Sequence, residues 1–389
     1  MPNPSNDLKP FQIDIPQQEL DDLNRRLADA RWPDELPEAG WDYGVSLDYL
    51  RDLADYWRKG YDWRKHERKL NELKQFITEI DGQTVHFAHV QSDTPNAVPL
   101  LLTHGWPSTF ADYSELAGPL ANPEAHGSPD APAFHVVIPS LPGFGFSGPT
   151  KERGWDITRI AHAWTELMRR LGYERFMVHG GDTGSMVSPE IARIAPDSVI
   201  GVHLNASVSA SVVDWNAENP TAGLSEEDVG RLYASAATWE ERSGYATLQS
   251  TRPQTLAYAL TDSPLGLLAW NLEWFVDYDP TRTEQTHIDW DAILTNITIY
   301  WLTRTSGSAA RIYKEGGNAF YGGARTEHPT AIALFPGDTA LRSLAEQQHN
   351  IVRWTEYERG GHFAALQAPD LLLQDIRQFT RELTYESTS

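Results

Sequence analysis

Short apolar runs alternate with amphipathic segments through most of the chain. The apolar runs predict strands buried on both faces, and they cover residues 98–107, 134–147, 175–185, 199–206, 330–336 and 351–362. A helical pattern over 186–196 separates two of them, and an amphipathic helix over 370–383 closes the chain. Buried strands that alternate with helices indicate a mostly parallel sheet with helices on both faces. Before these runs, residues 76–80 and 84–90 flank an Asp81-Gly82 turn and predict a hairpin.

Two helical patterns precede the first strand. Residues 15–33 place apolar side chains on one helical face, and residues 46–63 repeat this after Ser46, a candidate N-cap. Residues 1–10 are polar and are expected to form a flexible start. The two helices predict an N-terminal extension that packs on the main domain.

Residues 211–324 lack the rhythm of buried strands. They are rich in Trp and Tyr, follow helical spacing, and predict a helical cap inserted into the sheet domain. The resulting division is an N-terminal helical extension, a first core segment, a cap and a second core segment, with bounds 1–75, 76–210, 211–325 and 326–389.

Composition narrows the classes of function. The chain has 389 residues, a formal net charge of −22 and no cysteine. The acidic surface repels nucleic acid and anionic membranes, and the absence of cysteine excludes disulfides and thiolate chemistry. No apolar run of membrane-spanning length and no signal segment is evident, so we expect a cytoplasmic protein without a membrane partner.

Small residues crowd both sides of Asp182. Gly180 and Gly184 flank it at the end of an apolar run and the start of a helix, as in the turn that holds the nucleophile of α/β-hydrolases. The alternative is a glycine-rich helix start that binds phosphate. That alternative lacks a P-loop lysine and the GxGxxG spacing. We therefore interpret Asp182 as a nucleophile.

Other turns supply the rest of a hydrolase site. His104–Pro107 (HGWP) ends an earlier strand, where the N–H groups of Trp106 and Thr183 would form an oxyanion hole, although an ordinary turn is the alternative. Asp338 follows a later strand, and His362 follows the last one. The chain order of Asp182, Asp338 and His362 matches nucleophile, acid and base, with Asp338 able to accept a hydrogen bond from the imidazole. A turn aspartate is also common without any catalytic role.

An aspartate nucleophile indicates attack on a saturated carbon, such as that of an epoxide or an alkyl halide. Water activated by His362 would then hydrolyse the alkyl ester on Asp182. An epoxide also needs an acid for its oxygen, and Tyr245 and Tyr313 of the predicted cap are candidates among fifteen tyrosines.

Nearly the whole chain resembles the microsomal-type epoxide hydrolases, including bacterial soluble members. The matching stretches include RWPDE, HGWPS, PSLPGFGFS, GGDTGS, SGYATLQSTRP, RIYKE and ERGGHFAA. The resemblance implies an α/β-hydrolase fold with a cap and an N-terminal meander. It also implies Asp182 as nucleophile, His362 as base, Asp338 as acid, and Tyr245 with Tyr313 as donors to the epoxide oxygen. We expect the substrate pocket to include His104, Trp106, Pro107, Thr183 and Phe363.

Three departures from the family pattern stand out. We expect the chain to be without the hydrophobic anchor of the mammalian membrane enzyme. Asp338 replaces its glutamate, and Thr183 stands where a tryptophan often follows the nucleophile. A similarity to actinobacterial epoxide hydrolases of enediyne antibiotic pathways suggests a bulky aryl epoxide.

The resemblance predicts hydrolysis of a small-molecule epoxide with water, without cofactor or metal. A homodimer is left open. The alternatives are a haloalkane dehalogenase with the same nucleophile, a non-catalytic binding protein and an esterase. The esterase is disfavoured because Asp182 stands where a serine would be needed.

Overall fold

The computed structural model describes residues 8–207, 212–316 and 324–386. In this part of the chain, one sheet contains nine strands in the order β1-β2-β3-β5-β4-β6-β7-β8-β9. The strands are β1 (Lys9–Phe11), β2 (Gln75–Ile80), β3 (Gln83–Val90), β4 (Val98–Thr103), β5 (Phe134–Pro139), β6 (Phe176–Gly181), β7 (Val199–Asn205), β8 (Thr326–Leu334) and β9 (His349–Glu356). Antiparallel pairing joins β1, β2, β3 and β5, and the pairings from β5 through β4 to β9 are parallel. The predicted α/β fold with a mostly parallel sheet is confirmed.

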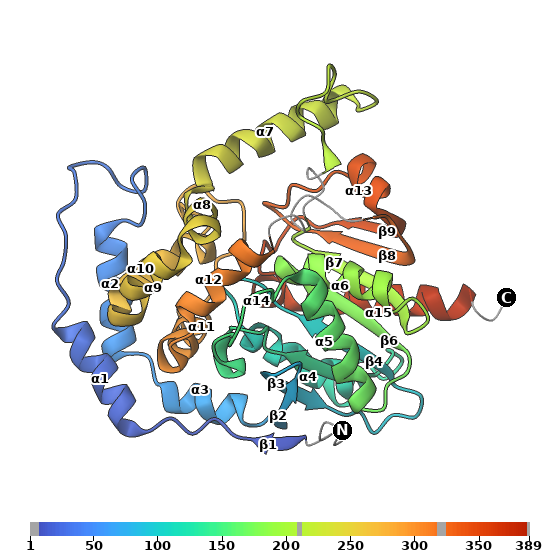
Figure 1. Cartoon of the computed structure of the whole chain (residues 1–389), viewed down its shortest axis with the longest axis horizontal. Coiled ribbons are helices and arrows are strands. Elements are labelled where there is room, and N and C mark those ends of the chain that lie inside the picture. The colour runs from blue at the N-terminus through green and yellow to red at the C-terminus, as the bar shows by residue number, and fades with distance from the viewer. Residues whose placement is uncertain (1–7, 208–211, 317–323, 387–389) are drawn as a thin grey trace.

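Both faces of the central strands are buried. In β4, Leu101 faces one apolar cluster, whereas Leu100 and Leu102 face the other. Side chains alternate across a strand, so an uninterrupted apolar run fits only a sheet covered on both sides. Helices α5 (Ile157–Arg170) and α6 (Thr183–Ile194) contribute to the first cluster, and α4 (Ser114–Ala121) and α15 (Pro369–Glu386) lie on the other face (Figure 1).

A helical cap follows β7, as the sequence predicts. Its described helices are α7 (Glu226–Arg242), α8 (Gly244–Thr251), α9 (Pro253–Asp262), α10 (Pro264–Phe275), α11 (Trp290–Thr303) and α12 (Ser306–Glu315). The first of these extends away from the others and buries only Leu232 (Figure 1). The chain then returns to the sheet through β8, α13 (Arg342–Gln348), β9 and α14 (Ala364–Gln367). Three short 3-10 helices, η1 (Phe110–Tyr113), η2 (Glu124–His126) and η3 (Gly145–Ser147), lie in connections of the core.

The N-terminal segment packs on the cap. Its helices are α1 (Gln17–Ala28), α2 (Leu47–Lys59) and α3 (Trp63–Leu70), of which α3 was not predicted as a separate helix. The Trp57 indole donates to Thr298 of α11 at 2.9 Å, and Arg26 donates to the Asp262 carbonyl at 2.7 Å. These contacts tie the segment to the cap helices.

Two local predictions at the N-terminus need correction. Ser46 occupies the N-cap of α2, but its side chain accepts no hydrogen bond. Residues 1–7 lie outside the described part, whereas Lys9–Phe11 forms β1 instead of a flexible start. β1 forms because its backbone pairs with β2, and three residues are too short to show a strand pattern in the sequence.

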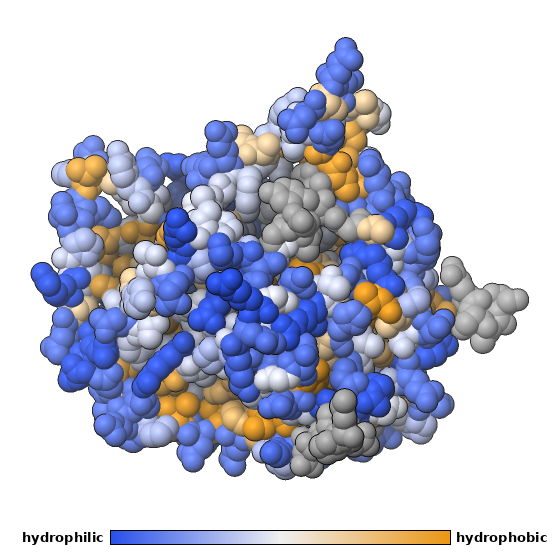
Figure 2. All heavy atoms as spheres, viewed as in Figure 1, coloured by the Kyte–Doolittle hydropathy of each residue, from blue (hydrophilic) through white to orange (hydrophobic). Residues whose placement is uncertain are grey.

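The visible surface is mostly polar. On the face shown in Figure 2, hydrophobic residues form separate patches between hydrophilic ones. Helices long and apolar enough to cross a bilayer do not occur in the described ranges.

Candidate active site

Asp182 stands at a sharp turn between β6 and α6. Its φ of 54° lies in a region that non-glycine residues seldom adopt, so the surrounding structure must hold it there. A Cβ atom on Gly180 would overlap the Gly184 carbonyl, and one on Gly184 would overlap the Thr103 carbonyl. The predicted crowding around this turn is confirmed. Ser185 uses its hydroxyl to close the turn by donating to the Asp182 carbonyl at 2.7 Å.

Hydrogen-bond donors converge on one oxygen of the Asp182 carboxylate. The Trp106 N–H donates to Oδ1 at 2.9 Å, and the Thr183 hydroxyl donates to the same atom at 3.0 Å. Gly105 has no side chain because a Cβ there would overlap the Asp182 carboxylate. Burial opposes the charge, but the nearby His362 and the N–H groups of Trp106 and Thr183 outweigh it and lower the pKa of Asp182 below 3.8. The carboxylate is thus held ionised.

His362 lies on the loop after β9 and faces the other oxygen of Asp182. Its Nε2 is 3.5 Å from Oδ2, which makes an ion pair but no well-formed hydrogen bond, and Nε2 has no hydrogen-bond partner among the described residues. Burial alone would lower the pKa of His362, whereas the contact with Asp182 and the charge of Asp338 raise it above 6.5. The Gln285 Oε1 accepts the His362 backbone N–H at 3.0 Å and fixes the loop.

Asp338 lies in the turn after β8, close enough to His362 for their charges to interact. The predicted hydrogen bond between this carboxylate and the imidazole does not occur in the part of the chain that is described. Instead, Asp338 Oδ2 accepts the Phe335 N–H at 3.0 Å, which closes the turn. Burial raises the pKa of Asp338 to about 6, against the opposing effects of Phe335 and His362.

Tyr245 of α8 and Tyr313 of α12 meet over Trp106. The Tyr245 ring stacks on the Trp106 ring with centroids 5.2 Å apart and 6° between the planes. Tyr313 meets Trp106 edge-on at 5.8 Å and Tyr245 edge-on at 5.6 Å. Burial raises the pKa of both phenols well above 10, so both remain neutral O–H donors. Two donors from the cap therefore lie above the turn that binds Asp182.

The remaining predicted pocket residues lie around this turn. His104 is buried, with Nδ1 2.9 Å from the Gly105 carbonyl and Nε2 accepting the Leu141 N–H at 3.2 Å. Backbone groups therefore contact both ring nitrogens of His104. Burial lowers the pKa of His104 to about 4, so the ring is neutral. Pro107 is buried after a cis peptide bond. Phe363 stacks on Phe275 at 4.7 Å and lines a cavity beside His362.

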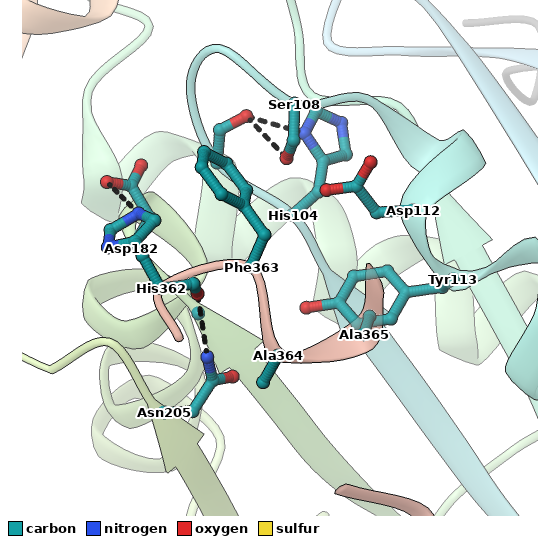
Figure 3. A pocket seen from close by; sticks show the side chains of 12 residues that line it. His104, Ser108, Asp112, Tyr113, Asp182, Asn205, His362, Phe363, Ala364 and Ala365 are labelled. Atoms are coloured by element: carbon teal, nitrogen blue, oxygen red, sulfur yellow. Dashed lines mark hydrogen bonds and ion pairs between the residues drawn. The ribbon is translucent and has the colours of Figure 1, made fainter. Parts of the chain in front are cut away.

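The cavity next to Asp182 and His362 includes residues that sequence patterns did not identify. Figure 3 shows Asp112, Tyr113 and Asn205 around it, together with four of the predicted residues, namely His104, Asp182, His362 and Phe363. The Trp274 ring lies 4.8 Å from the His362 ring on the cap side. The signal for Asp112 was its position eight residues after His104, within the same loop. Gln285 and Trp274 had no signal, because they reach the site only through the folded cap. No group of His, Asp and Glu suited to a metal ion occurs within the described residues.

Comparisons with known proteins agree with this geometry. Residues 8–113 match the family described as "Epoxide hydrolase N terminus", and residues 98–369 match the "alpha/beta hydrolase fold" family. A Stigmatella aurantiaca protein provisionally named an epoxide hydrolase is 41% identical over 97% of this chain and 85% of its own. "Epoxide hydrolase 1" of Sus scrofa is 34% identical over 96% of this chain and 88% of its own.

Solved structures extend the similarity to the whole fold. The epoxide hydrolase of Aspergillus niger superposes with a TM-score of 0.84 and 29% identity, covering 97% of each chain. The juvenile hormone epoxide hydrolase of Bombyx mori gives a TM-score of 0.87 and 27% identity, covering 98% of this chain and 96% of the other. Because these matches cover nearly its whole length, this chain belongs to the epoxide hydrolase family of the α/β-hydrolase fold.

Proposed function

We propose that this chain converts an epoxide and water into a vicinal diol through an ester on Asp182. The observation that carries the proposal is the ionised Asp182 carboxylate, which has one oxygen held by Trp106 and the other facing His362. The oxygen that faces His362 is not engaged by the oxyanion donors. It is therefore the better nucleophile toward a saturated carbon.

The first step is ring opening. Asp182 Oδ2 forms a bond to an epoxide carbon, and the C–O bond of that carbon breaks. Tyr245 and Tyr313 donate hydrogen bonds to the departing oxygen and supply its proton, which a neutral phenol can do. A halide would need no such acid, so the pair of phenols favours an epoxide over an alkyl halide.

The second step is hydrolysis of the ester. His362 removes a proton from water, and the water oxygen attacks the Asp182 carboxyl carbon. The developing oxyanion is stabilised by the donors that already bind Asp182 Oδ1, namely Trp106 and Thr183. The charge of Asp338 stabilises the imidazolium that forms.

The substrate class follows from the rings around the nucleophile. Aromatic side chains form a connected cluster of ring contacts that reaches from Trp106, which binds Asp182, to His362, and they are Trp106, Tyr245, Trp274, Phe275, Tyr313 and Phe363. Such rings favour flat apolar substituents over small polar ones. We propose a bulky or aryl epoxide as substrate, with no cofactor.

A single turnover in water enriched in oxygen-18 tests the two-step mechanism. With enzyme in excess, the first diol should be mostly unlabelled, and the label should enter a peptide that contains Asp182. An Asp182→Asn variant should form no ester, and a His362→Gln variant should accumulate an adduct of substrate mass on that peptide. Label in the first diol with none in the protein would refute the ester mechanism.

An assay of styrene oxide against haloalkanes separates the two leaving groups. Diol formation without halide release supports the proposal, and halide release without diol formation overturns it. Cytoplasmic location stays a prediction from the sequence, to be tested by cell fractionation. The oligomeric state stays open, and sedimentation would decide between a monomer and a homodimer. The division at residues 75, 210 and 325 is likewise proposed, with limited proteolysis as its test.

A further inference from the structure

A small cavity lies on the core side of the nucleophile. It has about 20 Å³ of room for the centre of a water molecule, which suffices for one water. Asp182 and His362 form part of its wall, and Asp112 and Tyr113 of η1 form another part (Figure 3). A molecule in this space lies beside both the ester carbon and the base of the second step.

Most other polar side chains around the cavity are engaged elsewhere. Backbone groups take both ring nitrogens of His104. The Ser108 hydroxyl donates to the Gly105 carbonyl at 3.2 Å and also interacts with the Asp112 carboxyl. The Tyr113 hydroxyl lies 3.3 Å from the Thr103 carbonyl, and the Asn205 amide donates to the His362 carbonyl at 3.3 Å. The mechanism so far gives no task to the carboxyl group of Asp112.

The Asp112 carboxyl is buried and held from the cap. Only 4% of the residue is exposed, and its Oδ1 accepts a hydrogen bond from Asn296 Nδ2 of α11 at 2.8 Å. The Thr109 hydroxyl in turn donates to Asn296 Oδ1 at 2.7 Å, so the amide orientation is fixed at both ends. Burial raises the pKa of Asp112 to about 7, against opposing hydrogen bonds from Asn296 and Ser108 and the charge of His362. A carboxylate can accept about four hydrogen bonds, so a water in the cavity can add one to those from Asn296 and Ser108.

We propose that this cavity seats the water of the second step and that Asp112 is the positioning residue that holds this water against His362 and Asp182. The inference rests on the proposed ester mechanism. One hydrogen of the water bonds to Asp112 while the other faces His362 Nε2, which has no hydrogen-bond partner within the described structure. The lone pair is then directed at the Asp182 carboxyl carbon.

The chemistry balances as follows. The water oxygen bonds to the Asp182 carbon, its first proton passes to His362, and the ester C–O bond breaks. The imidazolium returns that proton to the leaving alkoxide, which becomes the second hydroxyl of the diol. The remaining proton leaves when Asp182 ionises again, and it replaces the proton that a phenol gave to the epoxide oxygen in the first step.

Single-turnover kinetics with styrene oxide test the proposal on the full chain. Rapid quenching and mass spectrometry would measure formation and decay of the Asp182 ester separately. We expect Asp112→Ala to slow decay on the order of 100-fold, as for a misplaced reactant, and to change ester formation by less than about threefold. Asn296→Ala keeps the carboxyl but frees its orientation and should slow decay by about tenfold; this variant decides the question if Asp112→Ala does not fold.

Glu67→Gln serves as the matched control. Glu67 is also a buried carboxyl, with 7% exposed, but it accepts N–H groups of the N-terminal segment, such as that of Ile15 at 2.8 Å. Its loss should leave the ratio of the two rates unchanged. Equal slowing of both steps by Asp112→Ala, or no slowing of decay by the folded variants, would overturn the water site.

A crystal structure of the unmodified protein gives an independent readout. It should contain a water within about 3 Å of the Asp112 carboxyl, and an empty or differently occupied cavity would overturn the proposal. If no ester forms even in the unmodified protein, the proposed function itself fails. If the ester forms and decays normally without Asp112, only the water site fails.

Discussion

Replacing either cap phenol should slow ring opening without disturbing the ring packing. Tyr245→Phe and Tyr313→Phe each remove one O–H group and keep the aromatic contacts with Trp106. A hydrogen bond to a charged oxygen contributes about 1.5–3 kcal/mol, so each variant should form the ester roughly 10- to 150-fold more slowly. Since the two phenols share one oxygen, each compensates in part for the other. The double variant should therefore lose more than the product of the single losses.

Stopped-flow measurement of ester formation with excess epoxide checks this prediction. Tyr258→Phe is the matched control, because Tyr258 lies on the cap helix α9 and is 72% exposed. The raised pKa values of Tyr245 and Tyr313 also predict that neither phenol ionises between pH 6 and 9, so the loss should be independent of pH over about that range. Single-variant rates within about twofold of the control would refute the reasoning and leave the phenols as packing groups.

Three further predictions concern the base and the core. Gln285→Leu removes the acceptor of the His362 N–H, and single turnovers should show ester decay about tenfold slower with little change in ester formation. In the ester, Asp182 carries no charge, so it no longer raises the pKa of His362. His362 must be neutral to act as the base, and the rate of ester decay should therefore rise with pH. The midpoint of that rise should lie below the His362 pKa that NMR measures in the free protein. Asp375 is fully buried, and its contacts with His203 and Arg353 lower its pKa despite the burial. Asp375→Asn should reduce the free energy of unfolding by about 3–5 kcal/mol in urea titrations at pH 7. The stability that the Asp375 carboxylate contributes should be lost progressively as the pH falls below 3.8.

The sequence predicted a structural feature correctly where one short segment forms that feature by itself. The turn at Asp182 needs small neighbours within a few residues, and the structure has the backbone overlaps that exclude a side chain at Gly180 and Gly184. The buried strands were equally clear, because both faces of a central strand must be apolar. The roles of Asp182, His362, Asp338, Tyr245 and Tyr313 stay predictions until they are tested.

Contacts across long separations were not readable in this way. The Gln285 side chain meets His362 across 77 positions, and Asn296 meets Asp112 across 184. Neither glutamine nor asparagine follows a pattern that distinguishes a positioning role from an exposed one. The strand β1 was missed for a related reason, since its stability comes from pairing with β2 and not from its own three residues.

The two steps of the proposed reaction draw on different parts of the fold, and Trp106 lies between them. The acids for ring opening come from α8 and α12 of the cap, whereas the nucleophile and base come from turns of the core sheet. The cap nevertheless also contacts the core loop, because Tyr300 of α11 donates to the Ser108 carbonyl at 2.9 Å and Asn296 bonds Asp112. A cap that only covered substrate would not need such bonds to a core loop. Substitutions on α8 and α12 should therefore slow ester formation, whereas substitutions on the face of α11 that contacts the core loop should slow ester decay. Different cap helices would then support different steps of the reaction.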